Sequence, residues 1–206
     1  MDFNLAVFQE PRGVMRIVQF IFSICAFATI TGYTGFIQSD CQNTLTKHTF
    51  VYPFEVIIQA NISTNCSLNI VGDFSSDAKF FVTTGVLAML YSLAIMVVYT
   101  KLDKMYKSDA KIPLIDFVIT VIFAVLWLSS SAAWANGLTG LKTDTTVVSN
   151  KNNCAHCNLS TSSYSTLNIS VIFGFLNFFL WASDLWFLYK ETSWFQGNQR
   201  QTGDGV

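Results

Sequence analysis

Residues 114–134 read LIDFVITVIFAVLWLSSSAAW and decide the fold class of the chain. The only ionisable side chain in this stretch is Asp116, which lies near its start, where a negative charge suits the dipole of a helix. A helix needs about 20 mostly apolar residues to cross roughly 30 Å of hydrocarbon. Pro113 precedes the stretch, at a position where the missing N–H of proline costs a helix nothing. The stretch therefore predicts a membrane-spanning helix.

Three other segments are similarly long and apolar and lack an interior proline: 14–37, 80–99 and 169–189. Together with 114–134 they predict an all-α transmembrane domain over 14–190, with long connections at 38–79 and 135–168 and a short one at 100–113. Residues 1–13 and 191–206 flank this domain, and the polar tail is predicted to be disordered. Ala26-Phe27-Ala28 resembles a signal-peptidase site, but the apolar stretch is longer than the about 7–15 residues typical of a signal peptide.

The composition excludes several classes of protein. The 206 residues are 51% hydrophobic and only 12% charged, whereas soluble domains carry about 25% charged residues. A net charge of −1 creates no basic field for nucleic acid. With 2 histidines in the chain, little acid–base or metal chemistry is possible. We expect no catalytic residue, no bound metal and no cofactor.

The basic residues predict an orientation. Eight flank the spans on the side of the two termini and of the 100–113 connection, whereas the long connections carry four, spread over many more residues. Short flanks rich in Lys and Arg stay in the cytosol. Both termini and the short connection are therefore expected to be cytosolic, and the two long connections lumenal.

Cysteines and glycosylation sequons agree with this orientation, since disulfides and N-glycans belong outside the cytosol. Asn168 is expected to lie too close to the bilayer for modification. The remaining sequon residues and the cysteines of the long connections are Asn61, Asn65, Asn158, Cys41, Cys66, Cys154 and Cys157.

Four cysteines allow three disulfide pairings. Pairing within each connection, Cys41 with Cys66 and Cys154 with Cys157, is the simplest. Residues 154–157 also match a C-x-x-C redox motif, but no thioredoxin-like pattern surrounds them. A zinc site with His48 and His156 is a third interpretation. Cys25, in mid-membrane, is interpreted as a packing residue.

The first long connection contains β-branched and aromatic runs at 49–58 and 67–71. They predict two or three short strands in a small lumenal sheet, with Pro53 at an edge or a bulge. An irregular loop is the alternative.

Polar residues repeat every seven positions along the fourth segment, at Ser170, Asn177 and Asp184. They share one helix face, and polar groups in lipid usually face protein. The stripe predicts a packing surface between helices, with Asp184 close enough to the cytosolic end to reach water. An ion or proton pathway is the alternative.

Two further patterns concern helix packing and lipid. Ala28 and Gly32 are four residues apart on the first segment, a spacing that favours close helix association. Val97, Tyr99 and Lys101 match a proposed cholesterol-contact pattern, although Tyr and Lys at a helix end are also common interfacial anchors.

Several short motifs, spread over about residues 8–194 and in order along the chain, resemble those of the synaptophysin family, a branch of the MARVEL-domain proteins. The motifs are EPRG (10–13), FAT (27–29), YPF (52–54), VGDFSS (71–76), FFVT (80–83), WLSSSAAWA (127–135), NISV (168–171), FGFLN (173–177) and WFLYKET (186–192).

The resemblance implies a four-helix MARVEL bundle with a small disulfide-bonded lumenal cap, residence in transport or synaptic-like vesicles, cholesterol-rich membrane, homo-oligomers and association with a synaptobrevin-type vesicle SNARE. It also implies sequential disulfides within each lumenal loop. The chain lacks the long cytosolic tail of synaptophysin, so functions of that tail are not carried over, and its short tail is closer to pantophysin-like members. Asp184 and Arg12 also depart from the family pattern.

Three functions remain in competition. The first is a non-enzymatic protein that organises vesicle membranes and partners. The second is an oligomeric channel or transporter that uses the Ser170, Asn177 and Asp184 stripe. The third is a lumenal thiol oxidoreductase that uses Cys154 and Cys157.

Overall fold

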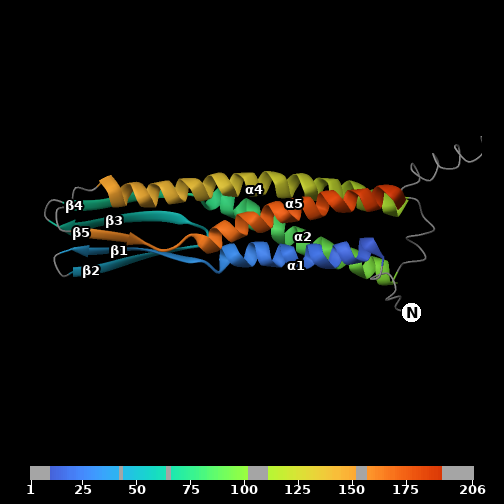
Figure 1. The fold of residues 1–206 in the computed structure, drawn as a ribbon, viewed down its shortest axis with the longest axis horizontal. Coiled ribbons are helices and arrows are strands. Elements are labelled where there is room, and N and C mark those ends of the chain that lie inside the picture. The colour runs from blue at the N-terminus through green and yellow to red at the C-terminus, as the bar shows by residue number, and fades with distance from the viewer. Residues whose placement is uncertain (1–9, 42–43, 64–65, 102–110, 152–156, 192–206) are drawn as a thin grey trace, which may run out of the picture. The chain divides into compact units, whose positions relative to one another are not determined.

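The computed structural model describes residues 10–41, 44–63, 66–101, 111–151 and 157–191. These residues form the helices α1 (Pro11–Thr31), α2 (Ser75–Lys101), α4 (Lys111–Lys151) and α5 (Ser165–Glu191). They also form the strands β1 (Thr34–Cys41), β2 (Thr44–Val51), β3 (Glu55–Ser63), β4 (Cys66–Asp73) and β5 (Cys157–Thr161) (Figure 1).

Each predicted span overlaps one helix, and two of the C-terminal ends differ most from the prediction. The first helix ends at Thr31 instead of Ile37, and β1 begins at Thr34. The third continues from the predicted end at Trp134 to Lys151. Trp134, Leu138 and Leu141 are all nearly fully buried, and their spacing places them on one helix face. Because of this buried face, α4 continues into residues 135–151. The polar residues of this segment had made it resemble a loop.

The chain divides into two compact units. The first comprises Met1–Cys25, Thr84–Ser129 and Phe173–Val206, and the second comprises Ala26–Thr83 and Ser130–Ile172. All of α1, α2, α4 and α5 contribute residues to both units.

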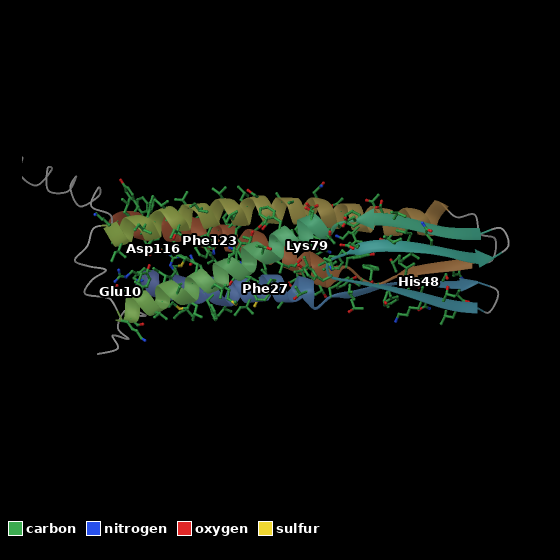
Figure 2. The ribbon with its side chains drawn as sticks, turned by 180° about the vertical axis from the view of Figure 1, so that it is seen from behind. Glu10, Phe27, His48, Lys79, Asp116 and Phe123 are labelled. Atoms are coloured by element: carbon green, nitrogen blue, oxygen red, sulfur yellow. The ribbon has the colours of Figure 1, made fainter. Side chains whose placement is uncertain are left out.

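Aromatic side chains form the core of the first unit. The Phe123 ring centroid lies 4.7 Å from that of Trp181 and 5.4 Å from that of Tyr91. Phe123 and Asp116 lie along the same helix, α4 (Figure 2). Large apolar side chains such as Val118, Ile122 and Val125 remain exposed, as expected of a helix face that meets lipid instead of protein.

The second unit contains a three-stranded antiparallel sheet in the order β2-β1-β5 and an antiparallel pair, β3-β4. The sequence predicted two or three strands in the first connection, whereas four of the described strands lie there and β5 comes from the second. Gly35 of β1 faces Phe50 of β2. A Cβ at position 35 would lie 2.2 Å from the Phe50 ring, so this close approach requires glycine.

A turn joins β2 to β3. The Tyr52-Pro53 peptide is cis, and Phe54 has a φ of 70°, in the left-handed region. The Phe54 N–H donates to the Val51 carbonyl at 2.8 Å. Pro53 was expected within an edge strand or a bulge, and it lies instead between two strands, where its missing N–H interrupts no ladder.

Aromatic residues also fill the interior of the second unit. The Phe54 ring stacks on Trp134 with centroids 5.4 Å apart. The Tyr33 hydroxyl donates to the Ser163 carbonyl at 3.0 Å, and the Tyr164 hydroxyl donates to Thr145 Oγ1 at 2.9 Å. Burial raises the pKa of both tyrosine hydroxyls. These bonds join the residue that precedes β1, and also α4, to the segment between β5 and α5.

The first turn of α2 carries an N-terminal cap. The Ser75 N–H donates to Asp73 Oδ1 at 2.9 Å, which is the contact that a capping carboxylate makes. This bond holds the pKa of Asp73 below its usual range. Asp77 lies in the first turn of α2, where its charge suits the helix dipole.

Candidate functional site, a buried ion-pair network

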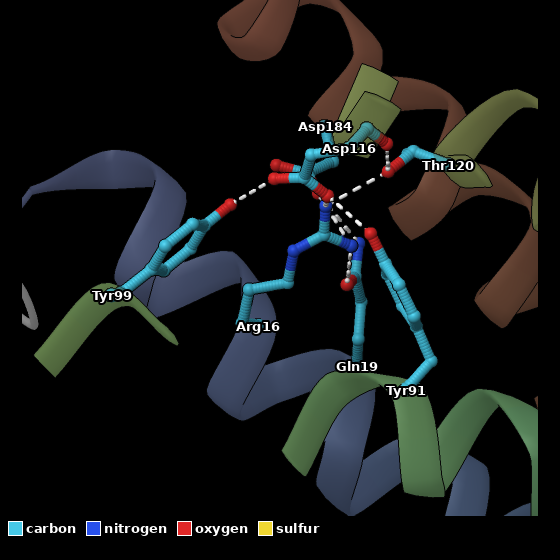
Figure 3. A network of polar contacts seen from close by, with 7 residues as sticks. All are labelled: Arg16, Gln19, Tyr91, Tyr99, Asp116, Thr120 and Asp184. Atoms are coloured by element: carbon cyan, nitrogen blue, oxygen red, sulfur yellow. Dashed lines mark hydrogen bonds and ion pairs between the residues drawn. The ribbon is translucent and has the colours of Figure 1, made fainter. Parts of the chain in front are cut away.

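Arg16 of α1 lies at the centre of a polar network within the first unit (Figure 3). Its Nη2 lies 2.7 Å from Asp116 Oδ1 and donates to Thr120 Oγ1 at 2.8 Å. Its Nη1 lies 3.2 Å from Asp184 Oδ2 and donates to Gln19 Oε1 at 2.9 Å. Since Asp116 and Thr120 belong to α4 and Asp184 to α5, one guanidinium connects three helices.

Two tyrosines connect the fourth helix, α2, to this network. The Tyr91 hydroxyl donates to Asp116 Oδ1 at 2.6 Å, and the Tyr99 hydroxyl donates to Asp116 Oδ2. Asp116 thus accepts from both α1 and α2. The Gln19 amide also donates to Asp184 Oδ2 at 3.1 Å, so two donors of α1 converge on one α5 carboxylate oxygen.

Aromatic rings surround the guanidinium. Arg16 Cζ lies 5.2 Å from the Trp181 ring centroid and 5.5 Å from that of Tyr91. The side chains of Arg16 and Asp184 are 0% exposed, and that of Asp116 is 1% exposed. Charges without water around them interact strongly. The charges of the network are therefore shielded from bulk water.

Burial on this scale is tolerated only because the charges are paired. Moving one ion out of water costs several kcal/mol even after relaxation, on the order of the gain from a well-formed pair. Arg16 uses its planar fork to bond two carboxylates and two neutral oxygens, which a lysine ammonium could not reproduce. The network specifies one arrangement of α1, α2, α4 and α5 within the first unit.

Two expectations about these acids require correction. Asp184 was expected to reach water at the end of its helix, but it is fully buried beside Arg16. Asp116 was interpreted as a charge that suits the start of its helix, but it is buried and accepts bonds from Arg16, Tyr91 and Tyr99. The network fixes both side chains inside the protein.

The other residues of the polar stripe are also fully buried. In the first unit, the Asn177 amide donates to the Phe22 carbonyl of α1 at 3.1 Å and to the Phe173 carbonyl of its own helix at 2.9 Å. In the second unit, Trp134 Nε1 of α4 donates to Ser170 Oγ at 2.9 Å. Each stripe residue therefore bonds to another helix.

The residues of the cholesterol pattern do not share one surface. Val97 is 46% exposed and Lys101 is also exposed. Tyr99 is only 1% exposed, and its hydroxyl is used by Asp116. A sterol on this face would therefore meet Val97 and Lys101 without the tyrosine.

The cysteine and sequon positions fall in or near the strands. Cys41 ends β1, Cys66 begins β4 and Cys157 begins β5. Asn61 lies in β3, and Asn158 is exposed on β5. Asn168 is exposed at the start of α5, where Lys142 Nζ donates to its Oδ1 at 2.5 Å. Cys154, His156 and Asn65 lie outside the described residues. Within the part of the chain that the structure describes, no group of three His, Cys, Asp or Glu could hold a metal.

Sequence reasoning missed Arg16 and Gln19 as site residues. Both lie within the predicted first span, where a charged or amide side chain is itself a signal. They lie three residues apart, which places them on the same helix face. Tyr91 and Thr120 carried no comparable signal because tyrosine and threonine are ordinary residues of membrane helices. Tyr99 was singled out only as part of the cholesterol-contact pattern.

Two findings bear on what this bundle is. Within the described residues, the helical segments Pro11–Thr31, Ser75–Lys101, Lys111–Thr145 and Ser165–Lys190 are long and apolar enough to cross a membrane. A family model described as a membrane-associating domain, MARVEL, matches residues 8–187.

Proposed function

Because the chain belongs to the MARVEL family of membrane-associating domains, we propose that it is a non-enzymatic component of transport or synaptic-like vesicles, where it organises the vesicle membrane and partner proteins. The chain is a multi-pass membrane protein with four candidate spans among its described residues. The assignment to vesicles goes beyond this finding and is supported by the synaptophysin-type motifs of the sequence.

The observation that carries the proposal is the buried ion-pair network around Arg16. The charges inside the first unit bond to one another and to neighbouring tyrosine, threonine and glutamine side chains. The outer surface offers apolar side chains such as Ile122 and Val125, which are more than half exposed. A fixed bundle with a lipid-facing surface is suited to holding lipids and proteins in place.

The resemblance supplies the partners of this proposal. They are cholesterol-rich membrane, further copies of the same chain and a synaptobrevin-type vesicle SNARE. In this arrangement both termini and the 100–113 connection face the cytosol, and the strands of the second unit face the vesicle lumen. The basic residues near the termini and in 100–113 support the orientation.

A channel or transporter is the second candidate, and the buried carboxylates favour it, because intramembrane acids often mark ion pathways. Asp184 is close to Arg16 and Gln19, however, and the Asn177 amide is bonded to two carbonyls. A conducting path would require these contacts to open.

Native organelles test the proposal directly. Membranes from cells that express the full chain with a cytosolic C-terminal tag are broken without detergent, captured through the tag and analysed by mass spectrometry. Small vesicles that carry a vesicle SNARE, together with chemical crosslinks between that SNARE and this chain, are the expected result. Capture of only non-vesicular membrane without SNARE proteins would overturn the proposal.

Flux measurements separate the two candidates. Purified protein in proteoliposomes is expected to give no ion flux above empty liposomes. A flux that persists in Val97→Ala and disappears in Asp184→Asn would replace the proposal with the channel.

A further inference from the structure

Strand pairing between β1 and β5 joins the two long connections. Its register is Ile37 with Thr161, Gln38 with Ser160, Ser39 with Leu159, Asp40 with Asn158 and Cys41 with Cys157. Among the described strands, this is the only ladder between the segment before α2 and the segment after α4. Two cysteines from different connections thus occupy directly opposite positions.

The hydrogen bonds beside the ladder show which of its residue pairs are of the hydrogen-bonded type and which are not. The Ser162 N–H donates to the Phe36 carbonyl at 3.0 Å, and the Phe36 N–H donates to Ser162 Oγ at 3.0 Å. The backbone groups of Phe36 and Ser162, one step beyond the Ile37 pair, therefore face each other as in a hydrogen-bonded pair. In antiparallel ladders, hydrogen-bonded and non-hydrogen-bonded pairs alternate. The register shows no irregularity over the five pairs. Counting along it makes Cys41 and Cys157 a non-hydrogen-bonded pair.

A non-hydrogen-bonded pair is the closer type, with Cα atoms about 4.5 Å apart. A disulfide requires Cα atoms about 4.4–6.8 Å apart. The backbone therefore satisfies the distance condition for a bond across the two strands. We propose that Cys41 and Cys157 form a disulfide that links the first long connection to the second.

The pairing within each connection is less well matched to the strands. Cys66 belongs to the β3-β4 ladder, where it lies opposite Ser63, so no ladder places it beside Cys41. A bond between Cys154 and Cys157 would leave Cys41 without the cysteine that the ladder places opposite it. The structure thus favours an inter-strand bond over the sequential bonds that the family resemblance implies.

The bond forms by thiol–disulfide exchange. The thiolate of one cysteine attacks a disulfide oxidant of the lumen and forms a mixed disulfide, and the second thiolate then displaces the oxidant's remaining thiol. The two cysteines lose two electrons and two protons, and the oxidant is reduced to a dithiol. This step rests on the proposed function, which places the strands on the lumenal side.

Tryptic peptides distinguish the pairings. Trypsin cleaves after Lys47, Lys79 and Lys151, so Cys41, Cys66 and the pair at 154 and 157 fall on three different peptides. Full-length protein is extracted from membranes with its free thiols alkylated at lysis, digested without reductant and sequenced by tandem mass spectrometry. The expected product is peptide 17–47 joined to peptide 152–190 through Cys41 and Cys157.

A pair of variants provides the control. Cys66→Ser/Cys154→Ser keeps Cys41 and Cys157, and these are expected to be oxidised, leaving Cys25 as the reactive thiol after denaturation. Cys66→Ser/Cys157→Ser keeps Cys41 and Cys154, which the ladder does not pair, and is expected to retain at least twice the reactive thiol. Equal thiol content in the two variants would overturn the inference.

The results distinguish a failure of the proposed pairing from a failure of the proposed function. Peptide 17–47 joined to peptide 48–79 overturns the proposed pairing and leaves the lumenal orientation standing. Fully reactive cysteines combined with an unmodified Asn158 would place the strands in the cytosol, which overturns the pairing and the orientation in the proposed function together.

Discussion

Replacing Arg16 by methionine is expected to destabilise the bundle strongly. Methionine keeps most of the apolar stem but removes the charge that lies 2.7 Å from Asp116 and 3.2 Å from Asp184. Both carboxylates then remain buried without their guanidinium. Breaking a buried pair in this way costs about 3–5 kcal/mol. At about 2–4 °C per kcal/mol for a chain of this size, the expected loss in Tm is roughly 6–20 °C.

Fluorescence-detected size-exclusion chromatography after heating measures this loss in detergent or nanodiscs. Lys190→Met is the matched control, because it removes one cation from the same unit at an exposed position, 5.1 Å from the Trp186 ring centroid. An exposed contact of this kind contributes about 0.5–1 kcal/mol. The control is therefore expected to shift the Tm by only a few degrees.

A second substitution tests the mechanism. Adding Asp184→Asn to Arg16→Met removes one of the two carboxylates left without the guanidinium, so the double variant is expected to recover about 0.5–3 kcal/mol relative to Arg16→Met. The reasoning fails if Arg16→Met loses no more stability than Lys190→Met, or if Asp184→Asn lowers the stability of the single variant further.

Four other predictions follow from contacts elsewhere. Gly35→Ala places a methyl group 2.2 Å from the Phe50 ring and is expected to cost about 1–3 kcal/mol by overpacking, measured as thermal stability beside the exposed Thr49→Ala. Trp134→Phe keeps the ring that stacks on Phe54 but loses the bond to Ser170, so about 1 kcal/mol of stability should be lost, well below the loss in Trp134→Ala. Tyr99→Phe removes a donor to Asp116 and should lower the Tm without reducing photo-crosslinking to a cholesterol probe, whereas Val97→Trp, at an exposed position, should change the crosslinking alone. The lowered pKa of Asp73 means that its cap is present above the ordinary pKa of aspartate and is lost as the pH falls through the lower folded value. The protection of the Ser75–Lys79 amides against hydrogen exchange, corrected for the pH dependence of the intrinsic exchange rate, should therefore fall on acidification in the wild type but be low at every pH in Asp73→Ala.

The spans could be predicted from sequence because hydrophobicity over about 20 residues is a local property. Residues 114–134, for example, carry that signal without any information from the rest of the chain. The end of α4 could not be predicted in this way, because Leu138 and Leu141 reveal their role only when buried against neighbours. The end of α1 was placed too late because Thr34–Cys41 is apolar enough at its start to resemble a helix, while its pairing with β2 and β5 is non-local.

The candidate site was likewise predictable from the sequence only in part. Asp184 and Asn177 were found because a seven-residue repeat is visible within one helix. Arg16, the partner that decides the role of Asp184, lies more than 160 residues away from it in sequence and was counted with the flanking basic residues. Which carboxylate a guanidinium meets depends on helix packing, which a single sequence does not express.

The pairing of β1 with β5 constrains how the protein is made. The two strands are separated by more than 100 residues, including α2 and α4. At about 5–20 residues per second, the ribosome delivers β5 several seconds after β1. During this interval one edge of β1 has no neighbour, and an unpaired strand edge invites association with other chains. Completion of the sheet therefore requires that the last connection has been delivered to the same side of the membrane as the first.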